Sequence, residues 1–177
     1  PSVSCKRCTQ AGRSATTSSS ESCDECPIGR YQNLAQSTVY GCKECQAGRA
    51  AVSATASTLC TACPPGKFQE LTASIEYNCK FCVAGKKFTS PATACLDCKL
   101  GQYHHQNDQL FAACKTCNIG RAAPSASEAC VACLTGSYQT LAVSTRYRCD
   151  VTPPGHILVS TLLTPTTCPH GYAAASQ

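Results

Sequence analysis

Polar and apolar positions along this chain follow two alternating loop patterns, and each loop is bounded by cysteines spaced Cys-x-x-Cys. In the first pattern, called short-polar here, a Gly-Arg or Gly-Lys step is followed mainly by Ala, Ser and Thr, with Phe88 as the one bulky exception. In the second, called aromatic, a Gly-x-aromatic step is followed by a polar residue, and another aromatic stands shortly before the closing cysteine. The short-polar loops therefore have almost nothing to bury.

The aromatic loops predict the secondary structure. Their Gly-x-aromatic-Gln stretches have the β propensity of a short strand, and the preceding glycine suits a turn with unusual backbone angles. The first aromatics of the four loops are Tyr31, Phe68, Tyr103 and Tyr138. We expect short two-stranded antiparallel β pieces and little helix.

The cysteine pairs also define a repeat. One short-polar loop plus one aromatic loop spans 37 residues in the first two copies and 35 in the last two. Because such units contact mainly their neighbours, we expect an elongated rod of tandem loops and not a globule. The expected units are residues 1–41, 42–78, 79–113 and 114–149.

Composition indicates what could hold such loops together. The 177 residues include 18 Cys, four Phe and seven Tyr, with no Trp and no Met. This cysteine density is typical of secreted disulfide scaffolds, and little large side-chain area is available for burial. By chain-entropy arguments, closing a loop of about 15 residues stabilises a fold by roughly 3 kcal/mol. The sequence thus predicts a small disulfide-rich repeat protein.

An oxidising compartment follows, because cytosolic thiols at this density would be kept reduced. We expect an extracellular protein, secreted or at the cell surface. No apolar run approaches the roughly 20 residues that span a bilayer. The sequence starts at Pro1 without a signal peptide, and we expect a processed or excised piece. A net charge of +5, with only 14% charged residues, is too dilute for a nucleic-acid partner.

Zinc is the chemical alternative to disulfides. Two Cys-x-x-Cys pairs separated by 12 to 15 residues can build a four-thiolate site. Composition and compartment favour disulfides, and we expect no metal and no cofactor. His104 and His105 are interpreted as a solvated surface pair. No nucleophile, base and orienting acid stand together in the pattern, so we expect no enzymatic activity.

Three Cys-Pro-x-Gly openings, at residues 26–31, 63–68 and 168–172, resemble those of ephrin-receptor-like and tumour-necrosis-factor-receptor-like cysteine-rich repeats, a growth-factor-receptor-type cysteine-rich domain. The likeness spans residues 5–149. It implies that the second cysteine of one pair is joined to the first cysteine of the next. The implied bridges are Cys8 to Cys23, Cys26 to Cys42, Cys45 to Cys60, Cys63 to Cys79, Cys82 to Cys95, Cys98 to Cys114, Cys117 to Cys130 and Cys133 to Cys149.

Two cysteines have no partner in this scheme. Cys5 is the first member of a pair and should close a loop, while Cys168 opens one that the chain does not close. Residues 169–177 and 1–4 together give a 13-residue segment, within the range of the other loops. We expect residues 168–177 to start a further loop that residues 1–5 of the next copy complete, by a peptide or a disulfide bond. The alternative is a coincidental truncation.

Residues 150–167 are the one segment that does not match the loop repeat, and we interpret them as an insert. Their β-prone apolar run at 156–163 predicts a strand with an exposed apolar face. Such a face usually marks a contact with another copy, although it could instead cover the last repeat of its own chain. The expected assembly interface is Ile157, Leu158, Val159, Leu162 and Leu163.

Glycans are a further expected partner. No Asn lies in an Asn-x-Ser/Thr sequon, but Thr-Pro contexts resemble mucin-like stalk sequence. Ordinary solvated turns are the alternative interpretation. The candidate O-glycosylation sites are Thr152, Thr164, Thr166 and Thr167.

Two functional classes remain. The first is an extracellular structural protein that forms a filament, stalk or matrix fibre with other copies of itself by head-to-tail continuation. The second is a receptor-type ectodomain whose repeats bind a protein ligand, because the resembling family includes both kinds. The regularity of the four units favours the first, since a ligand-binding surface should carry distinctive aromatic or Arg anchors in some units.

Overall fold

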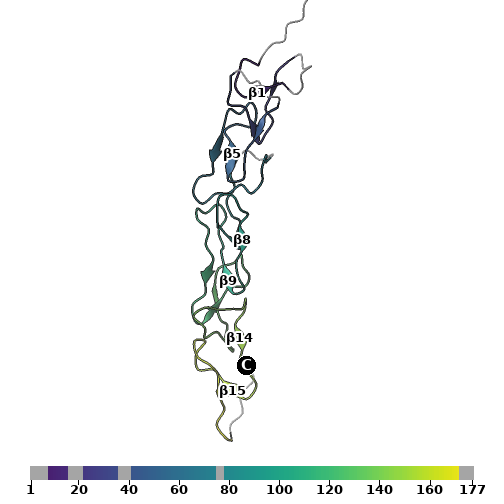
Figure 1. Cartoon of the computed structure of the whole chain (residues 1–177). Helices are drawn as coiled ribbons and strands as arrows, with labels where there is room; N and C mark the ends of the chain where they lie inside the picture. The colour runs from purple at the N-terminus through teal and green to yellow at the C-terminus, as the bar shows by residue number, and fades with distance from the viewer. Residues whose placement is uncertain (1–7, 16–21, 36–40, 75–77, 172–177) are drawn as a thin grey trace, which may run out of the picture. The chain divides into compact units, whose positions relative to one another are not determined.

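The computed structural model describes residues 8–15, 22–35, 41–74 and 78–171. Within these ranges there is no helix, and short strands pair two by two as antiparallel sheets (Figure 1). The pairs are β1 (Arg13–Ser14) with β2 (Asp24–Glu25), β3 (Arg30–Tyr31) with β4 (Lys43–Glu44), β5 (Arg49–Ala51) with β6 (Cys60–Ala62), β7 (Lys86–Lys87) with β8 (Leu96–Asp97), β9 (Gln102–Tyr103) with β10 (Lys115–Thr116), β11 (Arg121–Ala122) with β12 (Val131–Ala132), β13 (Ser137–Tyr138) with β14 (Asp150–Val151), and β15 (His156–Ile157) with β16 (Thr166–Thr167). An isolated bridge between Phe68 and Lys80 stands where a further sheet would be.

Disulfides close the loops that carry β1 to β14. They join Cys8 to Cys23, Cys26 to Cys42, Cys45 to Cys60, Cys63 to Cys79, Cys98 to Cys114, Cys117 to Cys130 and Cys133 to Cys149. Cys82 and Cys95 are also disulfide-bonded. These are the cysteines that the family resemblance pairs. Each of their sulfurs is part of a disulfide bond, whereas a zinc site would need them as free thiolates. The prediction of a small disulfide-rich repeat protein with short two-stranded β pieces is confirmed.

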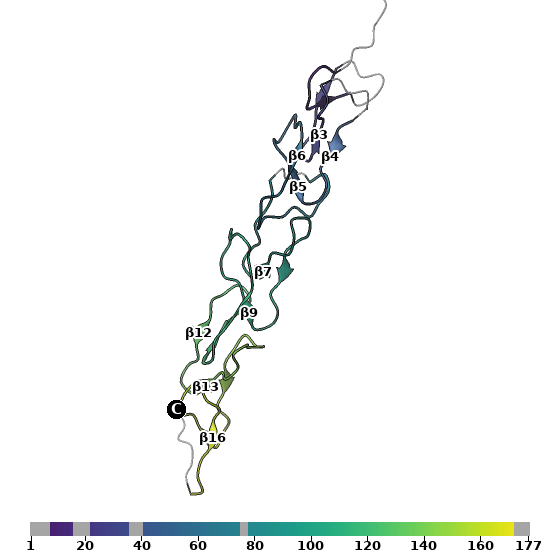
Figure 2. The ribbon, with the colours of Figure 1, turned by 60° about the vertical axis from the view of Figure 1, so that its left-hand side comes forward.

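The chain forms two compact units. The first comprises residues 1–81 and 88–95, and the second comprises residues 82–87 and 96–177. Within each unit, successive loops follow one another, with the short strands set between irregular turns (Figures 1 and 2).

Successive loops are tied together by a repeated pair of backbone hydrogen bonds. In each short-polar loop, the amide of the turn glycine donates to the carbonyl of one residue in the next aromatic loop, and we call that residue the polar slot. These bonds, each 2.7 Å long, run from Gly12 to Gln32, Gly48 to Gln69, Gly85 to His104 and Gly120 to Gln139. The amide of the polar slot then donates onward, from Gln32 to Ser57, Gln69 to Pro91, His104 to Ala126 and Gln139 to Thr161. Each aromatic loop is therefore bonded to the short-polar loop before it and to the loop after it.

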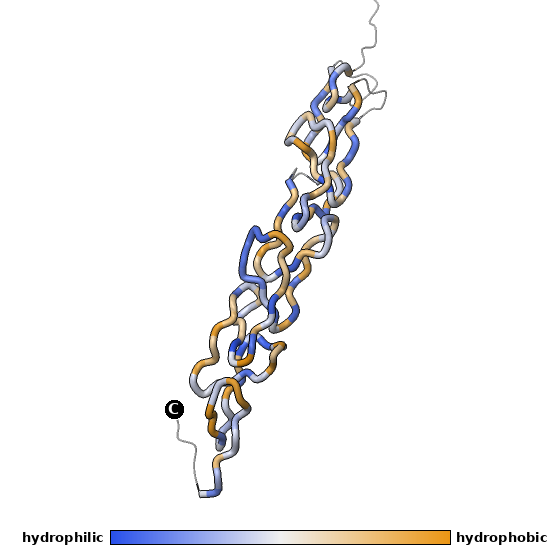
Figure 3. Tube along the Cα trace, turned by 90° about the vertical axis from the view of Figure 1, so that its left-hand side faces the viewer, coloured by the Kyte–Doolittle hydropathy of each residue, from blue (hydrophilic) through white to orange (hydrophobic). Residues whose placement is uncertain are grey.

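The buried residues are mainly half-cystines, residues with small side chains and the polar slots. The buried apolar residues of the described ranges are half-cystines and alanines, together with Phe68. The polar slots are almost completely enclosed, with Gln32 and Gln69 at 0% exposure. Hydrophobic and hydrophilic positions alternate along the trace of each unit (Figure 3). Across the part of the chain that the structure describes, there is no extended layer of large apolar side chains, so crosslinks and cross-loop hydrogen bonds hold the fold.

His104 departs from the expectation of a solvated surface pair. It occupies a polar slot and is 1% exposed, whereas His105 is exposed. Its Nε2 lies 2.9 Å from Gln109 Oε1, which can only accept a hydrogen bond, so that nitrogen carries the proton. The slot buries this side chain because its backbone is bonded to loops on both sides.

Candidate assembly site in the C-terminal loops

Residues 150–167 belong to the loop repeat, which corrects their interpretation as an insert. β15 pairs with β16 in the register in which β11 pairs with β12, and every paired residue lies 35 positions after its counterpart. That offset of 35 equals the length of each of the last two repeat units. The segment is thus a further loop of the short-polar kind in backbone conformation, although its side chains are apolar.

The expected strand over 156–163 is accordingly wrong in extent. The strand covers only His156–Ile157, and the chain then turns at Ser160. The Leu163 amide donates to the Ser160 carbonyl (3.1 Å), and the Thr161 carbonyl accepts from the amide of Gln139 (3.2 Å). These bonds hold a turn where the β propensity of the side chains alone favours an extended chain.

Two backbone bonds identify which positions of this loop correspond to cysteines. The Cys168 amide donates to the Gly155 carbonyl (2.9 Å), as the Cys133 amide does to the Gly120 carbonyl (2.9 Å). Cys168 is therefore the second member of its pair, the member that opens an aromatic loop. The Thr152 amide donates to the Gly136 carbonyl at 2.8 Å. An equivalent bond, 2.9 Å long, joins Cys45 to Gly29, so a threonine stands in a cysteine position.

The loop of residues 152–165 consequently lacks its disulfide. Pro165 stands three residues before Cys168, at the place of the first cysteine of the pair, and Thr152 is its missing partner. The Thr152 Oγ1 is buried and has no hydrogen-bond partner. A hydroxyl that is enclosed in this way cannot accept a glycan. The prediction of Thr152 as a glycosylation site is therefore wrong. Thr164, Thr166 and Thr167 are exposed.

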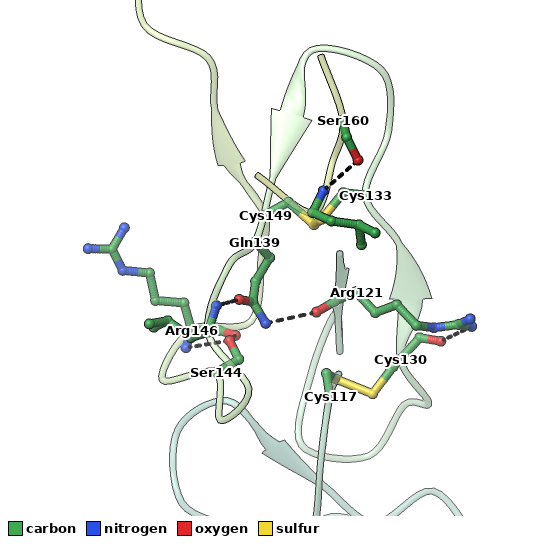
Figure 4. The surroundings of a disulfide bond; sticks show 11 residues. Cys117, Arg121, Cys130, Cys133, Gln139, Ser144, Arg146, Cys149 and Ser160 are labelled. Carbon is green, nitrogen blue, oxygen red and sulfur yellow. Dashed lines mark hydrogen bonds between the residues drawn. A yellow bond between two sulfur atoms is a disulfide. The ribbon is translucent and has the colours of Figure 1, made fainter. Parts of the chain in front are cut away.

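The preceding short-polar loop shows what the missing crosslink does where it is present. The Cys117–Cys130 disulfide closes a loop with the same sequence separation of 13 (Figure 4). Beside it, the Gln139 side chain donates from Nε2 to the Arg121 carbonyl (3.3 Å), so the crosslink and the polar slot hold the same turn (Figure 4). In residues 152–165 no disulfide joins the two ends of the loop, and hydrogen bonds alone hold it closed.

The apolar residues expected at the interface lie on this uncrosslinked loop. Val159 is 79% exposed, and Ile157, Leu162 and Leu163 are each exposed by about half, while Leu158 is half-buried. Leu162 also covers part of its own chain, because its Cδ2 would lie 2.3 Å from a Cβ placed on Gly120. The loop therefore contacts its own preceding repeat and leaves an open apolar face. The contact of that face with another copy stays a prediction.

Cys168 is the free cysteine of the described residues and is half-buried. Its equivalents Cys26, Cys63, Cys98 and Cys133 are each bonded to a cysteine 16 residues further on. Cys5, the expected partner of Cys168, lies outside the described residues.

Other surface features of the second compact unit carry less chemistry. A shallow depression of about 500 Å³ is lined by Leu100, Arg146, Tyr147 and Arg148, and Arg146 is paired with Asp150 (2.5 Å). Within the described ranges, no three His, Cys, Asp or Glu side chains are grouped as metal ligands. In the same ranges, no helix has the length and hydropathy to cross a membrane.

One signal in the sequence could have revealed the uncrosslinked loop. Residues 152–155 read Thr-Pro-Pro-Gly, which matches Cys-Pro-Pro-Gly at residues 63–66 with one substitution. A search for cysteines alone passes over it. A scan of the chain against models of known protein families finds no match, and a search of curated proteins finds no similar sequence.

Proposed function

We propose that this protein is an extracellular structural protein whose disulfide-closed loops continue from one copy to the next and build a filament, stalk or matrix fibre. The observation that carries the proposal is the position of Cys168. Its amide makes the bond that precedes every aromatic loop, and its thiol is free. A cysteine of another copy would complete the loop that Cys168 opens.

The chemistry of the loops supports this role. The disulfides are typical of extracellular or secreted proteins. The loop surfaces are mostly Ala, Ser and Thr with scattered apolar residues, and the units differ little, which suits a repeated structural element better than a receptor with localised anchors. The exposed Thr164, Thr166 and Thr167 remain acceptors for O-glycans in this proposal. We propose a structural rather than a catalytic role.

The connection between copies is a peptide or a disulfide bond that leads from Cys168 to Cys5. We propose the disulfide form, because the Cys168 thiol is free.

Removing the Cys168 thiol should abolish covalent assembly. Native protein is expected to run as a ladder of multimers on a non-reducing gel and as fibres in electron micrographs, whereas the Cys168→Ser variant should run as a single chain. The matched control is Thr167→Ser, which makes a similarly small change at the exposed neighbouring residue, keeps Cys168 and should leave the ladder unchanged. A native protein that is monomeric without reductant, or a Cys168→Ser variant that keeps its ladder, contradicts the proposal.

The elongated shape expected from the sequence has its own test. A compact domain of this length has a radius of gyration of about 16 Å. Because the loops bond only to their near neighbours within each unit, we expect small-angle scattering of the Cys168→Ser monomer to give a value at least half as large again. A radius near the compact value would exclude a rod.

A further inference from the structure

The closing strand of loop 152–165 is attached by backbone hydrogen bonds alone. β16 is held through its two-residue pairing with β15 and through the bond from the Cys168 amide to the Gly155 carbonyl (2.9 Å). β12 is paired to β11 in the same register but is also tied by the Cys117–Cys130 disulfide. β16 can therefore leave its own β15 without breaking a covalent bond, which no loop with a disulfide can do.

The turn of this loop also opposes the preference of its residues. Ile157, Leu158 and Val159 favour an extended chain, yet the closed loop is bent at Ser160, where the Leu162 amide donates to the Ser160 hydroxyl (3.2 Å). The bend leaves Val159 79% exposed. An extended hinge would satisfy the β propensity and would bring these apolar side chains within reach of a second strand.

We propose that this loop opens and exchanges between two copies of the chain. β16 of each copy then pairs with β15 of its partner, and the amide at position 168 donates to the partner subunit's Gly155. Every backbone bond between the two strands is remade between chains, so their energies cancel between the closed and the exchanged forms.

The balance between the two forms is set by the hinge. Residues 158–165 of the two copies extend side by side in the exchanged dimer and bury apolar side chains that the closed loop exposes. The exchange rests on the self-association proposed above and adds a second contact to it: because it is reciprocal, it joins two copies tail to tail, whereas the Cys168 to Cys5 junction joins them head to tail.

Cysteine crosslinking distinguishes exchange from simple contact. The background is the full chain with Cys5→Ser and Cys168→Ser, which removes the proposed covalent junction. One preparation adds Thr152→Cys, a second adds Pro165→Cys, and the two are mixed at high concentration and oxidised. In the exchanged dimer, position 152 of one copy faces position 165 of the other, so peptide mapping should find this crosslink.

A third preparation with Thr164→Cys in place of Pro165→Cys is the matched control, because it shifts the thiol by one residue. We expect at least tenfold less crosslink to position 152 from the control. Equal yields from the two mixtures would overturn the exchange and leave the Cys168 proposal untouched, because that is tested with Cys5 and Cys168 intact.

Amide hydrogen exchange gives a second test of whether the loop opens, and it does not need the added cysteines. In the same background, the amide at position 168 and that of Cys133 make equivalent bonds of 2.9 Å. Because loop 152–165 has no disulfide and can open locally, the amide at position 168 should exchange at least tenfold faster than the amide of Cys133. Equal protection of the two amides would show that loop 152–165 stays closed and would overturn the proposal.

Discussion

Replacing Gly101 with alanine is expected to destabilise the second compact unit by about 3 kcal/mol. Gly101 has φ +78°, a left-handed backbone conformation in which a side chain costs about 1 to 2 kcal/mol. An added Cβ would also lie 2.1 Å from the Ser144 carbonyl oxygen. That carbonyl belongs to a turn whose hydroxyl, Ser144 Oγ, donates to the Arg146 carbonyl (2.9 Å), so it cannot move aside cheaply.

Amide exchange at His104 reports this loss, because its bond to the Ala126 carbonyl (2.8 Å) lies three residues from the substitution. A loss of about 3 kcal/mol corresponds to roughly a hundredfold faster exchange. The matched control is Gly155→Ala. Gly155 has φ +74°, but no atom of the described residues lies within 4 Å of an added Cβ, so only the backbone cost of about 1 kcal/mol remains. Equal effects of the two substitutions would show that the close approach of the loops contributes nothing.

The spacing of the cysteines predicts the repeated loops of this fold, and the family resemblance implies which cysteines are joined. A Cys-x-x-Cys pair followed by a turn glycine marks where a hairpin begins. The regular interval to the next cysteine pair marks where its second strand lies. This is local information, since a disulfide restricts residues about 15 positions apart in sequence. The strands are short for the same reason: each pairs over two or three residues before the chain turns into the next loop.

The polar slots could not be predicted in the same way. Gln32 and Gln69 end short stretches with β propensity, and the sequence does not indicate their burial, because Gln is mostly exposed in proteins. They are buried because the backbone of each is bonded to two other loops. Such burial depends on contacts between loops about 20 to 25 residues apart, and no local pattern of apolar and polar residues encodes it.

The loop of residues 152–165 shows the limit of reasoning from one residue type. Its Thr152 and Pro165 conceal a repeat that the backbone reveals through the Cys168 to Gly155 bond. The apolar run within it predicted a strand by intrinsic propensity, but the loop geometry prevailed over six of its eight residues. Four of the five candidate assembly residues are exposed, because apolar residues without a core to fill must face solvent or a partner. Their role as an interface stays a prediction.

Removing the Cys117–Cys130 disulfide tests whether crosslinks or backbone bonds close the loops. The double variant Cys117→Ala/Cys130→Ala should keep its backbone conformation, because loop 152–165 has the same hydrogen bonds without a crosslink. Its stability against local opening should nevertheless fall by about 3 kcal/mol, since the open loop regains the freedom that the crosslink removed. Exchange of the Cys133 amide, which donates to the Gly120 carbonyl, should become roughly a hundredfold faster.

Thr152→Ala is the matched control for that variant. It alters the equivalent position in the loop that has no disulfide, and it removes a buried hydroxyl without a partner. The expected change is neutral or stabilising by about 1 kcal/mol, because an unsatisfied buried polar group costs that much or more. If the Cys117→Ala/Cys130→Ala variant kept the protection of its Cys133 amide, the backbone ladder would be sufficient to close every loop. The uncrosslinked loop would then have no special freedom, and both the role of the disulfides and the exchange of β16 would lose their physical basis.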